Sequence, residues 1–556
     1  MYTIIFKQED GPESKVFADT GANLLELAQQ AGVAIDAPCS GNGTCGKCRV
    51  RIMSGSVESK QTMHITDDEW EDNWRLACQS TVSGDASIWV PATAADFKKG
   101  IRTADLLSPA EMERYLRDTG RIFSSGLTRG VDQTGLGVAI DIGTTTVTAA
   151  LIDLANGEVK GKASAGNGQI RYGGDVINRI IQQSRPHGVE KLRHAVREET
   201  IIPILEELSV QAGAATTDIT RCTIAGNTTM QHLFVGADAQ SIRLEPFVPE
   251  FLELHGKTAA DLGLPIAPDA PVVFAPNVGS YVGGDISAGV LDTMMWDSDE
   301  LTLFIDLGTN GELVLGNRDY LLCCACSAGP AFEGGEISCG MRATDGAIEE
   351  ISIDDASHEP RYEVIGGGKP LGICGSGLID TVAELFRCGI ISPKGRFIHD
   401  EPRVIRDEYG AAEYVLAYPD QTEHGKAVTI NETDIDNFIR AKGAIFSAVR
   451  TMLKGIDLPT SSIERVMIAG GIGSGINMAN AISIGMLPKI GLERYGYIGN
   501  SSLTGACAML VSKDAENKVF EIGRNMTYLE LSTYPGYMDE FVAACFLPHT
   551  DASLFA

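Results

Sequence analysis

The chain has 556 residues, of which 44% are hydrophobic and 21% are charged, values typical of a globular protein with several domains. Its formal net charge of −29 at pH 7 argues against a nucleic-acid partner, because that binding needs basic side chains that neutralise phosphates. The sequence contains no run of about 18 apolar residues and does not begin like a signal peptide, so we expect no membrane span. We therefore expect a cytoplasmic protein.

Residues 1–94 are expected to form a small β-rich unit. Alternating apolar residues near the start of the chain and a closing apolar segment are typical of strands. In chain order, the expected elements are strands at 2–6 and 15–17, a helix at 23–30, a cysteine loop, a strand at 49–52 and a closing segment at 87–91.

The most informative pattern in this unit consists of four cysteines. Cys39, Cys45 and Cys48 lie in one glycine-rich loop with the spacing C-x5-C-x2-C, and Cys78 follows further along the chain. Three thiolates from one loop plus a distant fourth are how plant-type ferredoxins hold a 2Fe–2S cluster. The first spacing, five residues rather than four, resembles the adrenodoxin-like branch of that fold.

The glycines between the cysteines support the same prediction. Gly41, Gly43 and Gly46 allow the backbone to wrap closely and to direct N–H groups at the sulfurs. Zinc would prefer two C-x2-C pairs, and disulfides are rare in a reducing cytosol. The same glycines fit the dinucleotide pattern G-x-G-x-x-G, but that pattern needs a strand before it and a helix after it. The loop therefore predicts a 2Fe–2S cluster.

Residues 95–134 are expected to form a polar linker with one short helix at 108–117. Ser108 suits the N-cap, Pro109 the first helical position and Glu111 the third. The simplest use of this segment is a spacer that lets the redox domain swing.

From residue 135 onward the chain carries two copies of one hairpin pattern. A buried strand ends near Asp141 and runs into a Gly-Thr turn, and the pattern recurs at Asp306. We expect turn N–H groups and hydroxyls to hold phosphates across a cleft, and the two aspartates to hold Mg²⁺ or to orient a water. The turn residues expected to bind the nucleotide are Gly143, Thr144, Thr145, Thr146, Gly308, Thr309, Asn310 and Gly311.

A third glycine-rich segment follows a strand at 466–469. Its glycines would let an adenine or a ribose lie against the backbone, and no G-x4-G-K-[ST] motif competes with this interpretation. The residues expected to hold the nucleoside are Gly470, Gly471, Gly473, Ser474 and Gly475. Together with the two hairpins, this resembles the superfamily of sugar and acetate kinases, heat-shock ATPases and actin. The expected fold is thus an α+β ferredoxin (β-grasp) domain plus an α/β, two-lobed, ribonuclease-H-like ATPase, with lobes at 135–300 and 301–556.

The fusion of a ferredoxin unit, a linker and an actin-like ATPase resembles the reductive activators of corrinoid proteins. The segments that carry this resemblance besides the hairpins are 225–230, 278–285, 327–334 and 373–378. The resemblance implies that the cluster returns Co(II) of a corrinoid methyl carrier to Co(I) by one electron, with ATP supplying free energy for an uphill step. It also implies a corrinoid protein and an electron donor as partners, and it suggests a homodimer.

Several further residues have open roles. Ser327 could face the corrinoid, although a packed or capping serine is the favoured interpretation. Glu333 and Asp285 could position Mg²⁺ or a water, or could equally cap turns. The run Cys323, Cys324 and Cys326 is expected to be buried rather than metal-binding, because adjacent strand residues point to opposite faces.

Three alternative functions remain for the sequence. A small-molecule kinase with a redox-sensing ferredoxin domain fits the hairpins, but no sugar-binding signature is found. A non-catalytic, ATP-gated redox sensor would use the same motifs. An activator of acyl-CoA dehydratases is disfavoured, because those proteins share a 4Fe–4S cluster between subunits and lack the N-terminal domain.

Overall fold

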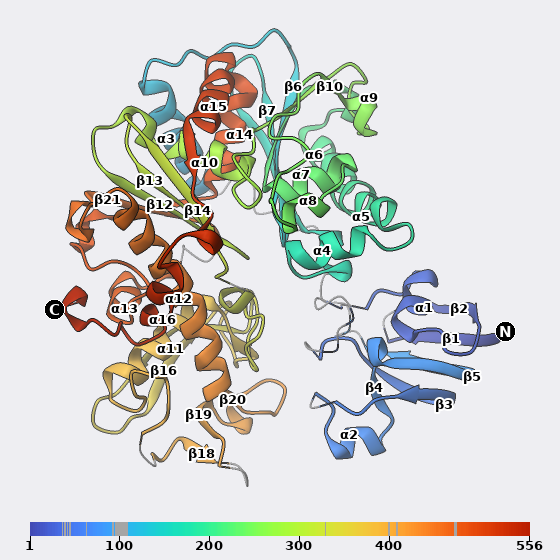
Figure 1. Cartoon of the computed structure of the whole chain (residues 1–556). Helices are drawn as coiled ribbons and strands as arrows, with labels where there is room; N and C mark the ends of the chain where they lie inside the picture. Colours follow the sequence, from blue (N-terminus) through green and yellow to red (C-terminus); the bar gives the residue numbers. More distant parts are fainter. Residues whose placement is uncertain are drawn as a thin grey trace. The chain divides into compact units, whose positions relative to one another are not determined.

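Figure 1 shows a computed structural model of the chain. The structure describes residues 1–9, 11–35, 37, 41, 43, 46–62, 64–91, 94, 109–328, 330–398, 401–406, 410–471 and 475–555. By its contacts the chain divides into two compact units, the first joining Met1–Arg114 with Gly130–Phe274 and the second joining Tyr115–Arg129 with Ala275–Ala556. Among the described helices, none has the length and apolarity needed to cross a membrane.

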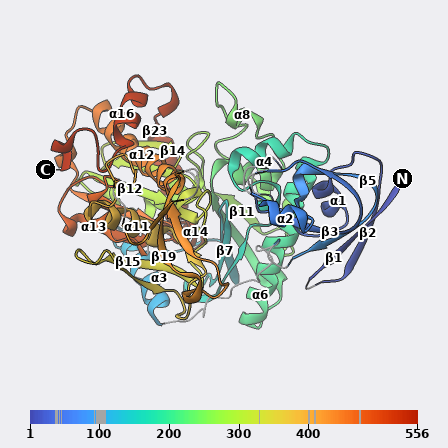
Figure 2. The same cartoon turned by 90° about the horizontal axis from the view of Figure 1, so that it is seen from below.

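The N-terminal segment forms the expected small sheet, in the order β2-β1-β5-β3-β4. Its strands are β1 (Tyr2–Gln8), β2 (Glu13–Ala18), β3 (Arg49–Ser59), β4 (Trp74–Leu76) and β5 (Ser80–Val90). Helix α1 (Leu24–Gln30) packs on this sheet through its apolar face (Figures 1 and 2). Asn23 caps the helix, since its side chain accepts hydrogen bonds from the N–H groups of Leu25 and Glu26. A short helix α2 (Asp67–Glu71) precedes β4.

A second sheet and the helices around it form the rest of the first unit. The strands of this sheet lie in the order β10-β11-β9-β6-β7-β8. Strands β6, β7 and β8 form an antiparallel meander, and β9 and β11 continue the sheet in parallel with β6. The strands are β6 (Leu136–Ile142), β7 (Thr146–Asp153), β8 (Val159–Gly166), β9 (Ile219–Gly226), β10 (Lys257–Thr258) and β11 (Pro271–Phe274). The helices are α4 (Val176–Gln183), α5 (Gly188–Val196), α6 (Ile202–Ala212), α7 (Thr228–Val235), α8 (Gln240–Arg243) and α9 (Ala259–Leu262).

The central sheet of the second unit repeats this topology, in the order β22-β21-β12-β13-β14-β23. Again three strands form an antiparallel meander and two continue the sheet in parallel. The strands are β12 (Thr302–Leu307), β13 (Gly311–Gly316), β14 (Leu321–Cys326), β21 (Arg465–Ala469), β22 (Tyr495–Gly499) and β23 (Met526–Tyr528). The predicted duplication of a ribonuclease-H-like lobe is therefore seen in the strand order.

The helices of the second unit pack around this sheet and two smaller ones. The longest is α12 (Glu432–Gly455), whose buried face lies in the main hydrophobic core. The others are α10 (Gly284–Thr293), α11 (Gly375–Arg387), α13 (Met478–Ser483), α14 (Ser501–Val511), α15 (Lys513–Asn525) and α16 (Tyr537–Ala544). The small sheets contain β15 (Ala347–Ile353), β16 (Pro360–Val364) and β17 (Gly372–Ile373), and β18 (Val404–Arg406), β19 (Ala412–Ala417) and β20 (Val428–Asn431).

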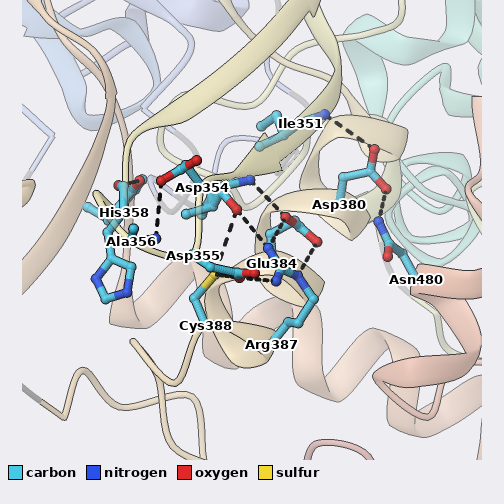
Figure 3. A network of polar contacts seen from close by, with 12 residues as sticks. Ile351, Asp354, Asp355, Ala356, His358, Asp380, Glu384, Arg387, Cys388 and Asn480 are labelled. Carbon is cyan, nitrogen blue, oxygen red and sulfur yellow. Dashed lines mark hydrogen bonds and ion pairs between the residues drawn. The ribbon is translucent and has the colours of Figure 1, made fainter.

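Two carboxylates of α11 tie this helix to its neighbours (Figure 3). Asp380 accepts a hydrogen bond from the Ile351 N–H at 3.3 Å and another from the Asn480 side chain of α13 at 2.7 Å. One turn later, Glu384 accepts a hydrogen bond from the Ile353 N–H at 2.7 Å. Burial raises the pKa of Asp380 above its usual value. The two side chains satisfy strand N–H groups of β15, and Asp380 fixes α13, the helix that follows the third glycine-rich segment.

The segment expected to be a linker contains helix α3 (Pro109–Ser124), which is longer than predicted. Ser108, the expected N-cap, lies outside the described residues. The helix continues past Arg117 because Arg121 donates hydrogen bonds to the carbonyl and carboxylate of Asp292, at 2.7 and 2.8 Å. Tertiary contacts thus override the poor helix propensity of residues 118–120. After the helix, the Thr128 N–H donates to Asp514 at 3.0 Å, so this part of the segment is anchored in the second unit.

The contact units divide the chain after Phe274, so that helix α10 belongs to the second unit. The physical reason is α10, which packs against α14 and α15 of the second unit (Figure 1).

Candidate functional site

Two of the four predicted cluster ligands are described, and the sheet brings them together. Cys48 precedes β3 and is fully buried, and Cys78 lies in the 3-10 turn between β4 and β5 with 7% of its surface exposed. Strands β3 and β4 pair so that the Ala77 N–H donates to the Cys48 carbonyl at 2.8 Å. Cys39 and Cys45 lie outside the described residues.

The described glycines of the cysteine loop have the backbone conformation that a cluster site requires. Gly41, Gly43 and Gly46 have φ angles of +85°, +79° and +65°, a conformation that side chains other than glycine rarely adopt. A Cβ on Gly41 would lie 3.6 Å from the Cys78 Cβ, so the loop backbone runs directly beside this ligand. The described residues therefore fit a 2Fe–2S cluster.

Gln79 provides a polar contact to the same site. Its side-chain amide donates to the Gly41 carbonyl at 3.2 Å and to the Cys78 sulfur at 3.7 Å. Hydrogen bonds to ligand sulfurs stabilise the reduced, more negative form of a cluster. Gln79 thus holds Gly41 of the loop, and its contact with the Cys78 sulfur would raise the reduction potential of a bound cluster.

We predict that Gln79→Leu lowers the midpoint potential of the cluster by about 20–60 mV, the equivalent of one ordinary hydrogen bond in a one-electron couple. A redox titration followed by electron paramagnetic resonance measures this shift. Gln8→Ala is the matched control, since the Gln8 amide also donates to a backbone carbonyl, that of Pro12 at 3.0 Å, in the same domain. An unchanged potential in Gln79→Leu would contradict the assigned contact.

The first predicted phosphate hairpin joins β6 to β7. Asp141 is half-buried near the end of β6, and the turn closes with a hydrogen bond from the Gly143 N–H to the Thr146 carbonyl at 3.1 Å. A Cβ on Gly143 would lie 2.5 Å from that carbonyl oxygen, so the turn requires glycine. Thr144 is buried, while Thr145 is half-buried and Thr146 is exposed.

The second predicted hairpin joins β12 to β13, with Asp306 half-buried near the end of β12. The Gly308 N–H donates to the Asn310 carbonyl at 3.1 Å, which closes the turn before Gly311. The Thr309 hydroxyl donates to Glu333 at 3.0 Å. The sequence left two roles open for Glu333, positioning of Mg²⁺ or water and capping of a turn. In the structure its side chain holds Thr309 of the turn.

The third predicted segment begins directly beside Asp306. Strands β12 and β21 are parallel and end together, with Asp306 opposite Ala469. A Cβ on Gly470, which has a φ of +92°, would lie 2.2 Å from the Leu307 carbonyl oxygen and 2.8 Å from the Asp306 carboxylate. Only glycine allows this approach, so the second hairpin and the glycine segment form one site.

The far end of the glycine segment meets helix α11. A Cβ on Gly475 would lie 3.1 Å from the Ser376 hydroxyl in the first turn of α11. Gly471 is exposed, and the remaining predicted residues, Gly473 and Ser474, lie outside the described part of the chain.

Glu312 is a site residue to which the sequence analysis assigned no role. It lies directly opposite Asp306 in the β12–β13 register and is buried. Burial and the negative charges of Asp285 and Asp306 raise the pKa of Glu312 well above its usual range, and a hydrogen bond from Asn310 opposes this rise. One feature of the sequence could have pointed to Glu312: it is the single acidic residue in the otherwise apolar strand β13.

Ser327 follows β14 and is exposed. Because Gly311 pairs with Cys326 across β13 and β14, Ser327 lies alongside the turn of the second hairpin. Cys323, Cys324 and Cys326 are buried, as predicted for packed thiols. Burial raises the pKa of Cys323 and Cys326 well above the usual thiol value.

Comparisons with known proteins agree with this order of domains along the chain. Residues 7–83 match the 2Fe–2S iron–sulfur cluster binding domain, residues 136–298 the RACo middle region, and residues 300–556 the C-terminal domain of RACo, the ASKHA domain. The fold and the sites thus define a ferredoxin joined to an actin-like, ATP-binding domain. The chain belongs to the RACo family, the reductive activators of corrinoid proteins, which confirms the resemblance seen in the sequence.

Three relatives illustrate this family. The corrinoid activation enzyme RamQ of Eubacterium limosum is 34% identical over 415 residues, which are 73% of this chain and 69% of the relative. The Co(II) methylated amine-specific corrinoid protein reductase of Methanosarcina barkeri is 23% identical over 70% of this chain and 73% of its own. A solved structure of a reductive activator for corrinoid, iron–sulfur protein is 40% identical, with both chains covered completely and a TM-score of 0.69.

Proposed function

We propose that this protein is an ATP-dependent reductive activator that returns the Co(II) form of a corrinoid methyl-carrier protein to Co(I). One observation carries the proposal: a single chain of this family combines a cysteine loop that is expected to hold a 2Fe–2S cluster with two hairpins that are expected to hold phosphates. The cobalt accepts one electron and no bond to carbon is made or broken. The donor of that electron inside the chain is the cluster held by Cys39, Cys45, Cys48 and Cys78.

The described cysteines and glycines explain how a bound cluster would be shielded from water. A 2Fe–2S cluster supplies one-electron transfer when it is bound. The buried sulfurs of Cys48 and Cys78 exclude water, and the positive φ angles of the loop glycines bring the backbone close to the ligands. We further propose that an external protein donor reduces this cluster, and that the activator works as a homodimer in the cytoplasm.

The nucleotide roles follow from the hairpins. We propose that Gly143, Thr144, Thr145 and Thr146 bind phosphates in one lobe, and that Gly308, Thr309, Asn310 and Gly311 bind them in the other. The segment from Gly470 to Gly475, including Gly471, Gly473 and Ser474, would hold the nucleoside. Support comes from the direct packing of Gly470 on Asp306, which joins the nucleoside segment to the second hairpin.

Asp141 and Asp306 are the proposed Mg²⁺ residues. No group of three metal-ligating side chains comes together in the described part of the chain. Mg²⁺ at nucleotide sites is commonly held by one or two carboxylates together with phosphates and waters, so either carboxylate alone is a suitable ligand. Bound Mg²⁺ would neutralise phosphate charge. It would also offset the negative charges of Asp285 and Asp306, which add to the effect of burial in raising the pKa of Glu312.

Ser327 is proposed to contact the corrinoid. Its exposure at the end of β14, beside the second hairpin, leaves the hydroxyl accessible to a partner. Because Ser327 lies next to the proposed phosphate hairpin, its contact with the corrinoid would depend on whether the nucleotide is bound.

The decisive experiment uses the full chain and a purified Co(II) corrinoid protein under anaerobic conditions. The Co(I) absorption band is expected to appear only when the chemically reduced chain, ATP and Mg²⁺ are all present. Omitting each component in turn supplies the controls. Complete reduction without ATP would refute the proposal, and so would phosphate transfer from ATP to a metabolite with no Co(I) formed.

A further inference from the structure

The three peptide carbonyls of the first hairpin turn are all held by the interior of their own lobe. The Gly143 carbonyl accepts a hydrogen bond from the Asn167 side-chain amide at 2.9 Å. The Thr144 carbonyl accepts one from the Arg179 guanidinium at 2.5 Å. The Thr145 carbonyl accepts one from the Asn167 N–H at 2.8 Å. Two residues thus fix three successive peptide planes.

This arrangement decides where the N–H groups of the turn point. In a trans peptide the N–H is directed opposite to the C=O of the same plane. The N–H groups of Thr144, Thr145 and Thr146 therefore point away from Asn167 and Arg179, and Thr146 itself is exposed. Successive N–H groups that point in one direction form an anion-binding nest.

Arg179 is itself held rigidly. It lies on α4 and is fully buried. Its Nε donates to the Gly173 carbonyl at 2.8 Å and its Nη1 to the Gln169 side chain at 3.3 Å. The planar guanidinium can serve these acceptors and the Thr144 carbonyl together, which a lysine ammonium on a flexible stem cannot do with the same geometry.

Asn167 is equally constrained. Its side-chain oxygen accepts a hydrogen bond from the Gln169 N–H at 3.0 Å and caps the following 3-10 turn, Gly168–Tyr172. With its oxygen engaged in this way, its amide nitrogen is directed at Gly143. A third contact holds the threonine side chain: the Asn227 amide donates to the Thr144 hydroxyl at 2.9 Å.

We propose that Arg179 and Asn167 are positioning residues for phosphate binding, which hold the peptide planes of residues 143–146 so that their N–H groups face the nucleotide. The buried positive charge of Arg179 also lies directly behind the turn and favours an anion in front of it. This inference rests on the proposed function in one respect only, namely that the chain binds ATP through this hairpin.

The test compares binding of two probes to the full chain by isothermal titration calorimetry: the non-hydrolysable ATP analogue adenylyl imidodiphosphate with Mg²⁺, and adenosine alone. In Arg179→Met, binding of the ATP analogue is expected to weaken about tenfold or more, the loss of one charge-assisted hydrogen bond. Adenosine has no phosphate, so its affinity is expected to stay unchanged. A merely structural role would lower both affinities together.

Two further variants keep the test decisive. Asn167→Asp keeps the oxygen that caps the 3-10 turn and replaces the amide donor by an acceptor, so it should weaken the ATP analogue selectively and decides the matter if Arg179→Met fails to fold. Gln183→Leu is the matched control on the same helix. Its buried side chain bonds the backbone of Ala237 and Ala239 at 2.6 and 2.9 Å, and no hydrogen bond found for it reaches the hairpin.

The outcomes separate this inference from the proposed function. Wild-type protein that binds adenosine but not the ATP analogue would overturn the proposed function. Wild-type protein that binds both, with variants that bind the analogue as tightly as Gln183→Leu does, would overturn only the positioning role. An equal loss of both probes would also overturn it, because the substitutions would then have damaged the lobe in general.

Discussion

Replacing Cys48 with alanine is expected to abolish reduction of the corrinoid protein while ATP hydrolysis continues. Cys48 is buried directly beside the segment that carries Cys78, so one ligand is lost without a change at any hairpin residue. A 2Fe–2S cluster of this kind is held by four thiolates, so we expect the variant, which has three, to lose it. Co(I) formation should fall to the background measured without the protein, and iron content and the visible absorption of the cluster should fall with it.

The control for this experiment is Cys388→Ala. Cys388 is half-buried at the end of α11 in the second unit, and no cluster role is proposed for it. Its substitution should leave the spectrum, the iron content and the Co(I) yield unchanged. If Cys48→Ala retained full Co(I) formation, the electron could not pass through the predicted cluster. If instead ATP hydrolysis disappeared with the cluster, the two sites would depend on each other structurally.

The parts of the fold that the sequence predicted are those with a local pattern. The strand-loop-strand order around the cluster follows from alternating residues and from glycine positions that require a positive φ. The same holds for the two hairpins, where a Cβ on Gly143 or Gly470 would lie only 2.5 or 2.2 Å from a carbonyl oxygen. A glycine pattern of this kind can be recognised without knowledge of the tertiary structure.

The parts that were missed depend on contacts between distant segments. Strand β3 extends to Ser59, whereas the sequence predicted a strand only to residue 52, because Gly55 and its serine neighbours have low strand propensity. Pairing with β5, through two irregularities in register, carries the strand through this stretch. Helix α3 likewise continues past its predicted end because Arg121 donates a hydrogen bond to Asp292. Such partners are not visible in a local window.

The residues that support the nucleotide site were missed for a related reason. The side chains of Asn167 and Arg179 contact the hairpin, as does the backbone N–H of Asn167. Their partners are backbone carbonyls, which every residue has and which therefore leave no signal in the sequence. Glu312 directly follows the predicted turn residues of the second hairpin, but only the strand register shows that it lies opposite Asp306. Motifs therefore located the turns, and the structure located what holds them.

Asp306→Asn is expected to reduce ATP hydrolysis about a hundredfold or more, a magnitude typical for the loss of one preorganised electrostatic group. Asparagine has the same shape, so the close packing of Gly470 against this side chain is preserved and the site keeps its form. The change removes one negative charge at the place where we propose Mg²⁺ to bind, and a neutral amide is a weaker ligand for a hard cation than a carboxylate. The Mg²⁺ concentration needed for half-maximal activity should therefore rise.

Steady-state ATPase assays across a range of Mg²⁺ concentrations measure both effects, and the anaerobic cobalt assay should show a parallel loss of Co(I). Asp319→Asn is the matched control, because Asp319 is an exposed acidic residue at the opposite end of the same hairpin strands. Its activity and Mg²⁺ dependence should equal those of the wild type. Normal hydrolysis in Asp306→Asn would remove the second hairpin from the catalytic site. Normal hydrolysis with no Co(I) formed would instead place Asp306 in the coupling between ATP and electron transfer.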